Sequence, residues 1–64
     1  MTKEELDKLK PGDLIKPKEY NYKIEVVAIK DRGIVGVLHK DKTHKHFADW
    51  NCLLEDFDLV QSVN

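Results

Sequence analysis

Residues 23–40 read KIEVVAIKDRGIVGVLHK and contain two apolar runs that are rich in β-branched side chains. The runs, Ile24–Ile29 and Ile34–Leu38, are separated by a short polar segment that ends in Gly33. This arrangement is typical of a β-hairpin. We predict a three-residue loop, Asp31-Arg32-Gly33, in which Gly33 adopts the left-handed conformation that closes such loops.

The loop length sets the register of this hairpin and therefore decides which side chains face the core. With three loop residues, Val27 faces Val37, Ile29 faces Val35, and these four side chains share one face. The opposite face then carries Val26, Ala28, Gly36 and Leu38. A two-residue Arg32-Gly33 loop is the alternative, and it would shift the pairing by one residue and mix the two sets.

Shorter elements are predicted on both sides of the hairpin. The segment Thr2-Lys3-Glu4-Glu5 has the pattern of a capping box and begins a short helix, which ends before Pro11. A first strand covers Asp13–Lys16 and stops at Pro17. After the hairpin we predict a strand, a single helical turn and a last strand, at His46–Trp50, Asn51–Asp56 and Asp58–Val63.

The same patterns predict a core of nine side chains, most of them β-branched or aromatic. These are Leu14, Val27, Ile29, Val35, Val37, Phe47, Leu54, Phe57 and Leu59. A core of this size is consistent with one small domain that covers residues 1–64.

Composition limits the class of protein. Charged residues make up 36% of the chain and hydrophobic residues 41%, which is a globular balance. The single cysteine excludes an internal disulfide and fits a reducing compartment. No apolar run approaches the roughly 20 residues that span a bilayer, and no signal peptide is evident, so we expect a cytoplasmic protein without a membrane partner.

Charge is unevenly distributed along the chain, although the net charge is only −1. Up to Phe47, eleven Lys and Arg stand against eight Asp and Glu, whereas residues 48–64 carry four acidic residues and no basic one. Two interpretations stay open: ordinary surface variation, or a dipolar surface that orients a charged partner.

The order of elements resembles an SH3-like small β-barrel. Two segments carry the resemblance: LKPGDLI at residues 9–15, and Trp50 together with LEDFDLV at residues 54–60. Openings and closings of this form recur in such barrels, including short proteins encoded by phages and prophages. The resemblance implies an all-β fold, a single barrel of about five short antiparallel strands, with an N-terminal helical turn and a one-turn helix before the last strand. It implies binding rather than catalysis and assigns no functional residue.

Five side chains of metal-binding type lie close together in the sequence: His39, Asp41, His44, His46 and Cys52. Their spacing matches no standard zinc pattern, so a metal site ranks third among our hypotheses and we predict no cofactor. In the predicted register Glu25 lies opposite His39 and forms a cross-strand pair with it. Cys52 could act as a nucleophile, but we interpret it as a small buried hydrophobe. The sequence has no phosphate-binding glycine loop and no nucleophile elbow, and we predict that the protein is not an enzyme.

Basic and aromatic side chains gather in the predicted loops. The candidate binding residues are Lys16, Lys18, Tyr20, Tyr22, Lys23, Arg32, Lys42 and His44. Tyr20, Tyr22 and Arg32 are residue types that anchor protein interfaces, and we predict an adaptor or inhibitor that binds a larger protein. Single-stranded nucleic acid is the alternative, because aromatic side chains among lysines stack on bases. The pI near 6.3 falls short of the basic character usual for nucleic-acid-binding domains.

Overall fold

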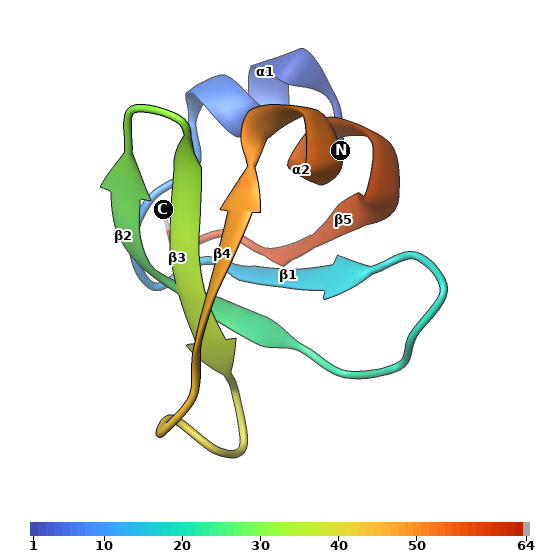
Figure 1. Cartoon of the computed structure of the whole chain (residues 1–64). Coiled ribbons are helices and arrows are strands. Elements are labelled where there is room, and N and C mark those ends of the chain that lie inside the picture. The colour runs from blue at the N-terminus through green and yellow to red at the C-terminus, as the bar shows by residue number, and fades with distance from the viewer. Residues whose placement is uncertain (64) are drawn as a thin grey trace.

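Five antiparallel strands form one sheet in the computed structural model, which describes residues 1–63 (Figure 1). The strands are β1 (Leu14–Pro17), β2 (Ile24–Lys30), β3 (Gly33–Leu38), β4 (Lys45–Asp49) and β5 (Phe57–Gln61). Their order is β4-β3-β2-β1-β5, so β4 and β5 are the two ends of a curved sheet. The prediction of an all-β, small barrel-like domain is confirmed.

Two short helices lie together at one end of the barrel: α1 (Lys3–Asp7) and α2 (Trp50–Asp56) (Figure 1). The predicted capping box is present, because the Glu5 amide donates to Thr2 Oγ1 at 3.1 Å and the Thr2 amide donates to Glu5 Oε1 at 2.8 Å. Asp49 caps α2 by accepting a hydrogen bond from the Cys52 amide at 2.8 Å. Within residues 1–63 neither helix is long and apolar enough to cross a membrane.

Asp13 joins the beginning of the barrel to its end. Its side chain is almost fully buried, with 1% of its surface exposed. The carboxylate accepts one hydrogen bond from the Lys10 amide and another from the Val63 amide, both at 2.9 Å. A buried carboxylate is tolerated only when it is hydrogen-bonded in this way. Asp13 therefore holds the chain after β5 against the turn that precedes β1.

The β2–β3 hairpin has a different register from the predicted one. Lys30 pairs with Gly33, so the loop contains only Asp31 and Arg32. Gly33 does not adopt a positive φ, and the predicted left-handed closure is wrong. A Cβ at Gly33 would instead collide with the carbonyl oxygen of Ala48 on β4, so glycine is needed here for the close approach of two strands.

A bulge at Val27 accounts for the rest of the difference. The pairing shifts between Val26, which faces Gly36, and Ala28, which faces Val35. A bulge adds one residue to one strand and so changes which side chains point inward. Gly36 leaves room for the Ile24 side chain on β2, because a Cβ at position 36 would lie 2.5 Å from it.

Most of the predicted core is therefore wrong. The buried cluster consists of Met1, Leu9, Ile15, Ile24, Val26, Ile34 and Leu53. Of the nine predicted residues only Val37 is buried, and it does not belong to this cluster. Phe57 and Leu59 pack against the cluster while remaining partly exposed. Leu14 and Val35 are half-buried, whereas the other four are exposed: Val27, Ile29, Phe47 and Leu54.

Candidate functional site

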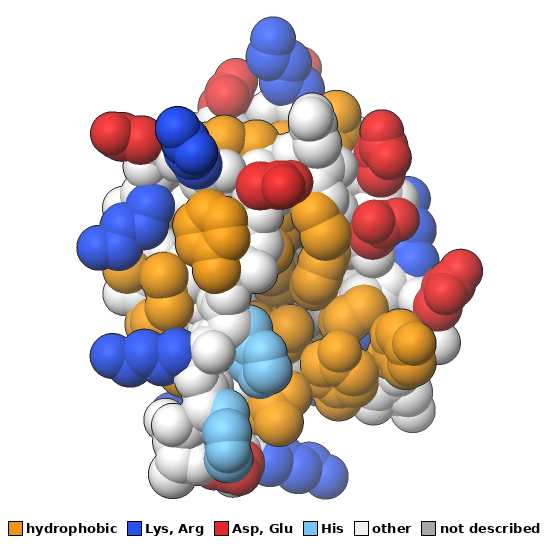
Figure 2. Space-filling model, in the orientation of Figure 1, with side chains coloured by type: hydrophobic (Ala, Val, Ile, Leu, Met, Phe, Trp, Pro, Cys, Tyr) orange, Lys and Arg blue, Asp and Glu red, His pale blue; other side chains and the backbone are white. Residues whose placement is uncertain are grey.

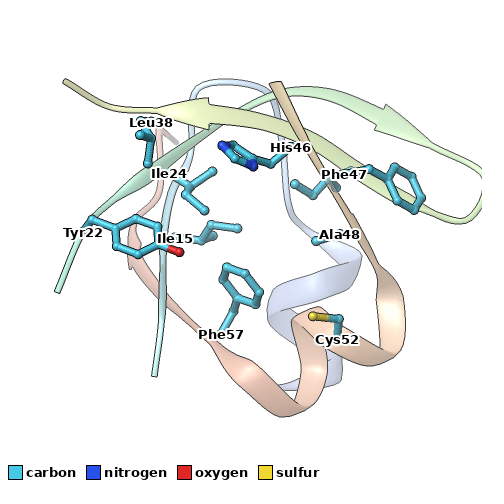
Figure 3. Close-up of a pocket in the computed structure, with 10 residues that line it drawn as sticks. Ile15, Tyr22, Ile24, Leu38, His46, Phe47, Ala48, Cys52 and Phe57 are labelled. Atoms are coloured by element: carbon cyan, nitrogen blue, oxygen red, sulfur yellow. The ribbon is translucent and has the colours of Figure 1, made fainter. Parts of the chain in front are cut away.

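An apolar groove opens between the two ends of the sheet, where β4 and β5 are not paired with each other. Its volume is ≈ 520 Å³, and Figure 3 shows the side chains that surround it. We call it the β4–β5 groove, and it is lined by Ile15, Tyr22, Ile24, Ile34, Leu38, His46, Phe47, Ala48, Cys52 and Phe57. The groove exists because a five-stranded sheet of this length curves without closing.

The floor and the walls of the groove come from different parts of the chain. Ile15, Ile24 and Ile34 form the floor and also belong to the buried core. On the β4 wall, His46 points over the floor while the neighbouring Phe47 points away from it, as the alternation of a strand requires (Figure 3). Phe57 lies on the opposite wall. The surface of the groove is therefore mostly apolar and has few polar groups.

Composition, rather than size, distinguishes this groove. Four further depressions have volumes of ≈ 420–460 Å³, and charged side chains contribute to the lining of each. The β4–β5 groove has no Asp, Glu, Lys or Arg in its lining. Figure 2 shows hydrophobic side chains across the hollow centre of this face, with acidic side chains along the upper right border and basic ones on the left.

Cys52 lies on the α2 wall of the groove and is half-buried. Its thiol donates a weak hydrogen bond to Asp56 Oδ2 at 3.8 Å. Burial raises the pKa of the Cys52 thiol, and the negative charges of Asp56 and Asp49 raise it further. A raised pKa keeps the sulfur protonated at neutral pH, so the geometry gives Cys52 no activation as a nucleophile.

The two predicted tyrosines form an exposed aromatic pair in the loop between β1 and β2. The rings of Tyr20 and Tyr22 lie 5.8 Å apart with planes tilted by 42°, and the residues are 61% and 43% exposed. Lys16 Nζ donates to the carbonyl oxygens of Pro17 and Tyr20, both at 3.1 Å. Lys16, one of the predicted binding residues, therefore also holds the loop in shape.

This loop lies against the acidic end of α2. The Lys18 amide donates to the carbonyl oxygen of Asp56 at 2.8 Å. Tyr20 and Tyr22 share a depression of ≈ 460 Å³ with the side chains of Glu55 and Asp56. Negative charge beside the aromatic pair disfavours a phosphate backbone at this place.

The β1–β2 loop also meets the loop between β3 and β4. The His39 amide donates to the carbonyl oxygen of Lys23 at 2.9 Å, so the predicted Lys23 and Lys42 lie on two connections that share one side of the barrel. Lys42 Nζ lies 3.3 Å from Glu25 Oε1, which also contacts His39 Nδ1 at 3.7 Å. The predicted contact between Glu25 and His39 is present, although Glu25 is paired in register with Val37.

The three histidines occupy separate places. His39 contacts Glu25, His44 contacts Asp41 at 3.6 Å, and His46 lies over the groove. Hydrogen bonds from Thr43 lower the pKa of the exposed Asp41. Among residues 1–63, no group of three or more His, Cys, Asp or Glu side chains could hold a metal ion.

Arg32 is separated from the other predicted binding residues. It lies at the tip of the β2–β3 hairpin, at the end of the barrel that carries the helices (Figure 1). Its carbonyl oxygen accepts from the Trp50 amide at 3.1 Å, and the Trp50 indole donates to the Asp31 carbonyl oxygen at 2.9 Å. The half-buried Trp50, which also packs against the buried cluster, thus anchors the hairpin tip.

Sequence reasoning found Tyr22 and missed the remaining walls of the groove. The sequence patterns place Phe47 and Phe57 in the core and predict that Cys52 is a small buried hydrophobe. The groove depends on β4 and β5 remaining apart, and no local pattern reports on that separation. One signal was available, because His46 stands between Lys45 and Phe47 in a strand that is too polar for a fully buried position.

Comparison with protein-family models, with curated proteins and with solved structures found no match to this chain. The function is therefore argued from the residues of the site and their surroundings.

Proposed function

We propose that this chain is a small, non-enzymatic binding module that holds an extended apolar segment of a larger protein in the β4–β5 groove. The observation that carries the proposal is an open groove with an apolar lining on a domain of only 64 residues. Binding sites are typically concave, largely apolar and supplied with a few polar groups that orient the ligand. Here the Tyr22 hydroxyl and the His46 imidazole are such groups.

The exposed aromatic side chains support a protein ligand. Tyr20 and Tyr22 extend the apolar surface beyond one end of the groove, and tyrosine is enriched among residues that dominate binding energy. The acidic side chains of Glu55 and Asp56 beside them favour a partner segment with a basic residue next to its apolar ones. The protein would act as an adaptor or as an inhibitor that covers a site on its partner.

Origin and location complete the proposal. The LKPGDLI and LEDFDLV segments support an SH3-like barrel of the kind that phages and prophages encode. The single cysteine, which fits a reducing compartment, supports a location in the cytoplasm. The raised pKa of Cys52 supports a binding role for the groove over a nucleophilic one.

Peptide selection on the immobilised full chain tests the proposal. Selected peptides should share apolar residues, and they should slow alkylation of Cys52, the single thiol, because it lies on the groove wall. Cys52→Phe fills the groove and should abolish binding of these peptides, measured by fluorescence anisotropy. Val27→Ser changes an exposed side chain outside the groove lining and should leave binding unchanged. Peptides that bind Cys52→Phe as well as the natural chain would contradict the proposal.

Nucleic-acid binding remains the second candidate, because the exposed tyrosine pair lies among lysines. It requires that affinity for single-stranded oligonucleotides fall steeply with added salt and be lost in Lys18→Ala and Tyr22→Ala. The protein-binding proposal predicts that Lys18→Ala leaves peptide binding intact, so this variant separates the two candidates.

A further inference from the structure

β4 is an edge strand with an exposed aromatic side chain at its centre. Within residues 1–63 it pairs only with β3, and it does so continuously over its five residues. Phe47 is 58% exposed, and its ring points away from the floor of the groove, although the residue belongs to the groove lining (Figure 3). Natural edge strands are usually protected by proline, by a bulge, by charged side chains such as lysine, or by a covering element. β4 has neither proline nor a shift in its pairing, and its charged side chains, Lys45 and Asp49, have opposite signs. Its outer edge can therefore pair with a strand whose charges complement them.

The charges along β4 are arranged symmetrically about Phe47. Lys45 and Asp49 lie two residues before and two residues after it, so all three side chains share one face of the strand. The Asp49 carboxylate is fixed in place, because Asp49 Oδ1 accepts the capping hydrogen bond from the Cys52 amide. An antiparallel copy of the same strand would bring opposite charges face to face at both ends.

We propose that two copies of this chain pair through their β4 edges, antiparallel, about a two-fold axis that passes through Phe47. Lys45 of each copy then faces Asp49 of the second copy, and the two Phe47 side chains face each other. On the other side of the strand, His46 faces the small side chain of Ala48, which leaves room for the imidazole. Each copy contributes the same surface, as a closed two-fold dimer requires.

Other registers do not pair the charges. A two-fold axis at His46 would place Lys45 opposite Phe47, and an axis at Ala48 would place Asp49 opposite Phe47. A parallel arrangement would align Lys45 with Lys45, and like charges directly opposite each other are destabilising. Because β4 carries both the basic and the acidic end of the required pattern, a second copy is the partner that fits it.

The small size of the contact sets the expected affinity. Five residues on each side fall well below the roughly 20–30 residues per partner of a standard interface. We therefore expect a dimer with a dissociation constant on the order of 100 µM. Sedimentation velocity on the full chain, from about 10 µM to about 1 mM, should show a reversible shift from monomer to dimer. A chain that stays monomeric over this range would overturn the proposal.

A double-mutant cycle tests the charge pairing. Lys45→Glu places like charges at both ends of the contact and should weaken the dimer at least ~10-fold. Asp49→Asn removes the charge while keeping an effective cap for α2, and should weaken the dimer ~3-fold. Residues 45 and 49 lie too far apart within one copy to pair, so the double variant should dimerise about as well as Asp49→Asn alone. Effects that simply multiply would overturn the pairing.

Cross-linking tests the register. In a Cys52→Ser background, Phe47→Cys places two thiols opposite each other across the axis, within the Cα separation that a disulfide spans. Lys45→Cys places its two thiols at opposite ends of the contact. Mild oxidation should therefore cross-link the first variant and leave the second monomeric, and equal cross-linking of both would overturn the register.

Control variants separate this inference from the proposed function. Tyr20→Ala removes an aromatic side chain as exposed as Phe47, and it should leave the dimer intact. Lys45→Glu should weaken the dimer and still bind the peptides selected on the groove, because Lys45 does not line the groove. A natural chain that dimerises without binding apolar peptides would contradict only the proposed function, and one that binds them but stays monomeric would contradict only the dimer.

Discussion

The two sides of this barrel differ in whether neighbouring strands are paired. On the closed side, β5 pairs with β1, and the carboxylate of Asp13 accepts hydrogen bonds from Lys10 and Val63. On the open side, β4 and β5 stay apart, and apolar side chains line a groove. The closed side supplies hydrogen bonds to a buried carboxylate, while the open side leaves apolar surface exposed and, within residues 1–63, the outer edges of β4 and β5 unpaired.

This difference separates stability from function in a very small domain. A chain of 64 residues has few side chains to bury, so a surface that leaves apolar groups exposed lowers its margin of stability. Variants on the closed side should therefore act on folding. Variants on the open side should act on binding and leave the melting temperature nearly unchanged.

The largest effect is expected at Asp13. Asp13→Ala leaves the amides of Lys10 and Val63 without their buried acceptor, and the free energy of unfolding should fall by about 3 kcal/mol. Urea titration followed by circular dichroism measures this change.

An exposed aspartate on β5 provides the control for this variant. Asp58→Ala should change the free energy of unfolding by less than about 0.5 kcal/mol. A loss below about 1 kcal/mol for Asp13→Ala would mean that water solvates the two amides in the variant. The closed side would then contribute no more to the free energy of unfolding than the open side.

Two neighbouring valines sharpen the comparison within one strand. Val26 is fully buried, whereas Val27 lies in the bulge and is 39% exposed. Val26→Ala should lower the free energy of unfolding by about 2 kcal/mol through lost burial and a cavity, and Val27→Ala by less than about 0.5 kcal/mol. The reverse order would restore the register expected from a three-residue loop. Melting temperatures of the two variants, measured side by side, decide between the registers.

The hairpin shows what can be predicted from the sequence and where such prediction ends. The capping box, the strands near residues 14–17, 24–30 and 34–38, and the helix before the last strand follow from local patterns, and all are present. The register depended on the role of Gly33, which serves the close approach of β4 rather than the turn. This reason is tertiary and leaves no signal in the local sequence. The resulting error in the pairing is one residue near the loop and two residues beyond the bulge, and on β2 it placed Val27 inside where Val26 is buried.

The groove could not be predicted from the sequence for a related reason. Its floor consists of core isoleucines and its walls of residues that a pattern places in the core, such as Phe57. Whether a wall closes depends on the curvature of the whole sheet, which the strands determine together. The loop residues Tyr20, Tyr22 and Lys23 were identifiable because their exposure follows from local polarity alone.

The smallest effect concerns the reactivity of Cys52, the one thiol on the open side. Its pKa is raised by burial and by the charge of Asp56, so less thiolate is present at pH 7–8 than in a free cysteine. Alkylation by iodoacetamide should be slower than for a free thiol, and its midpoint should shift to higher pH. Asp56→Asn removes the negative charge that raises the Cys52 pKa, so the rate at pH 8 should rise a few-fold.

Asp58→Asn is the matched control for this measurement, because Asp58 is not among the groups that shift the Cys52 pKa. Its alkylation rate should equal that of the natural chain. A midpoint below that of a free thiol would instead indicate an activated cysteine, and the open side would then have to be considered as a site of nucleophilic chemistry. A raised midpoint, together with protection by a selected peptide, would place Cys52 on the wall of a binding groove whose chemistry is inert.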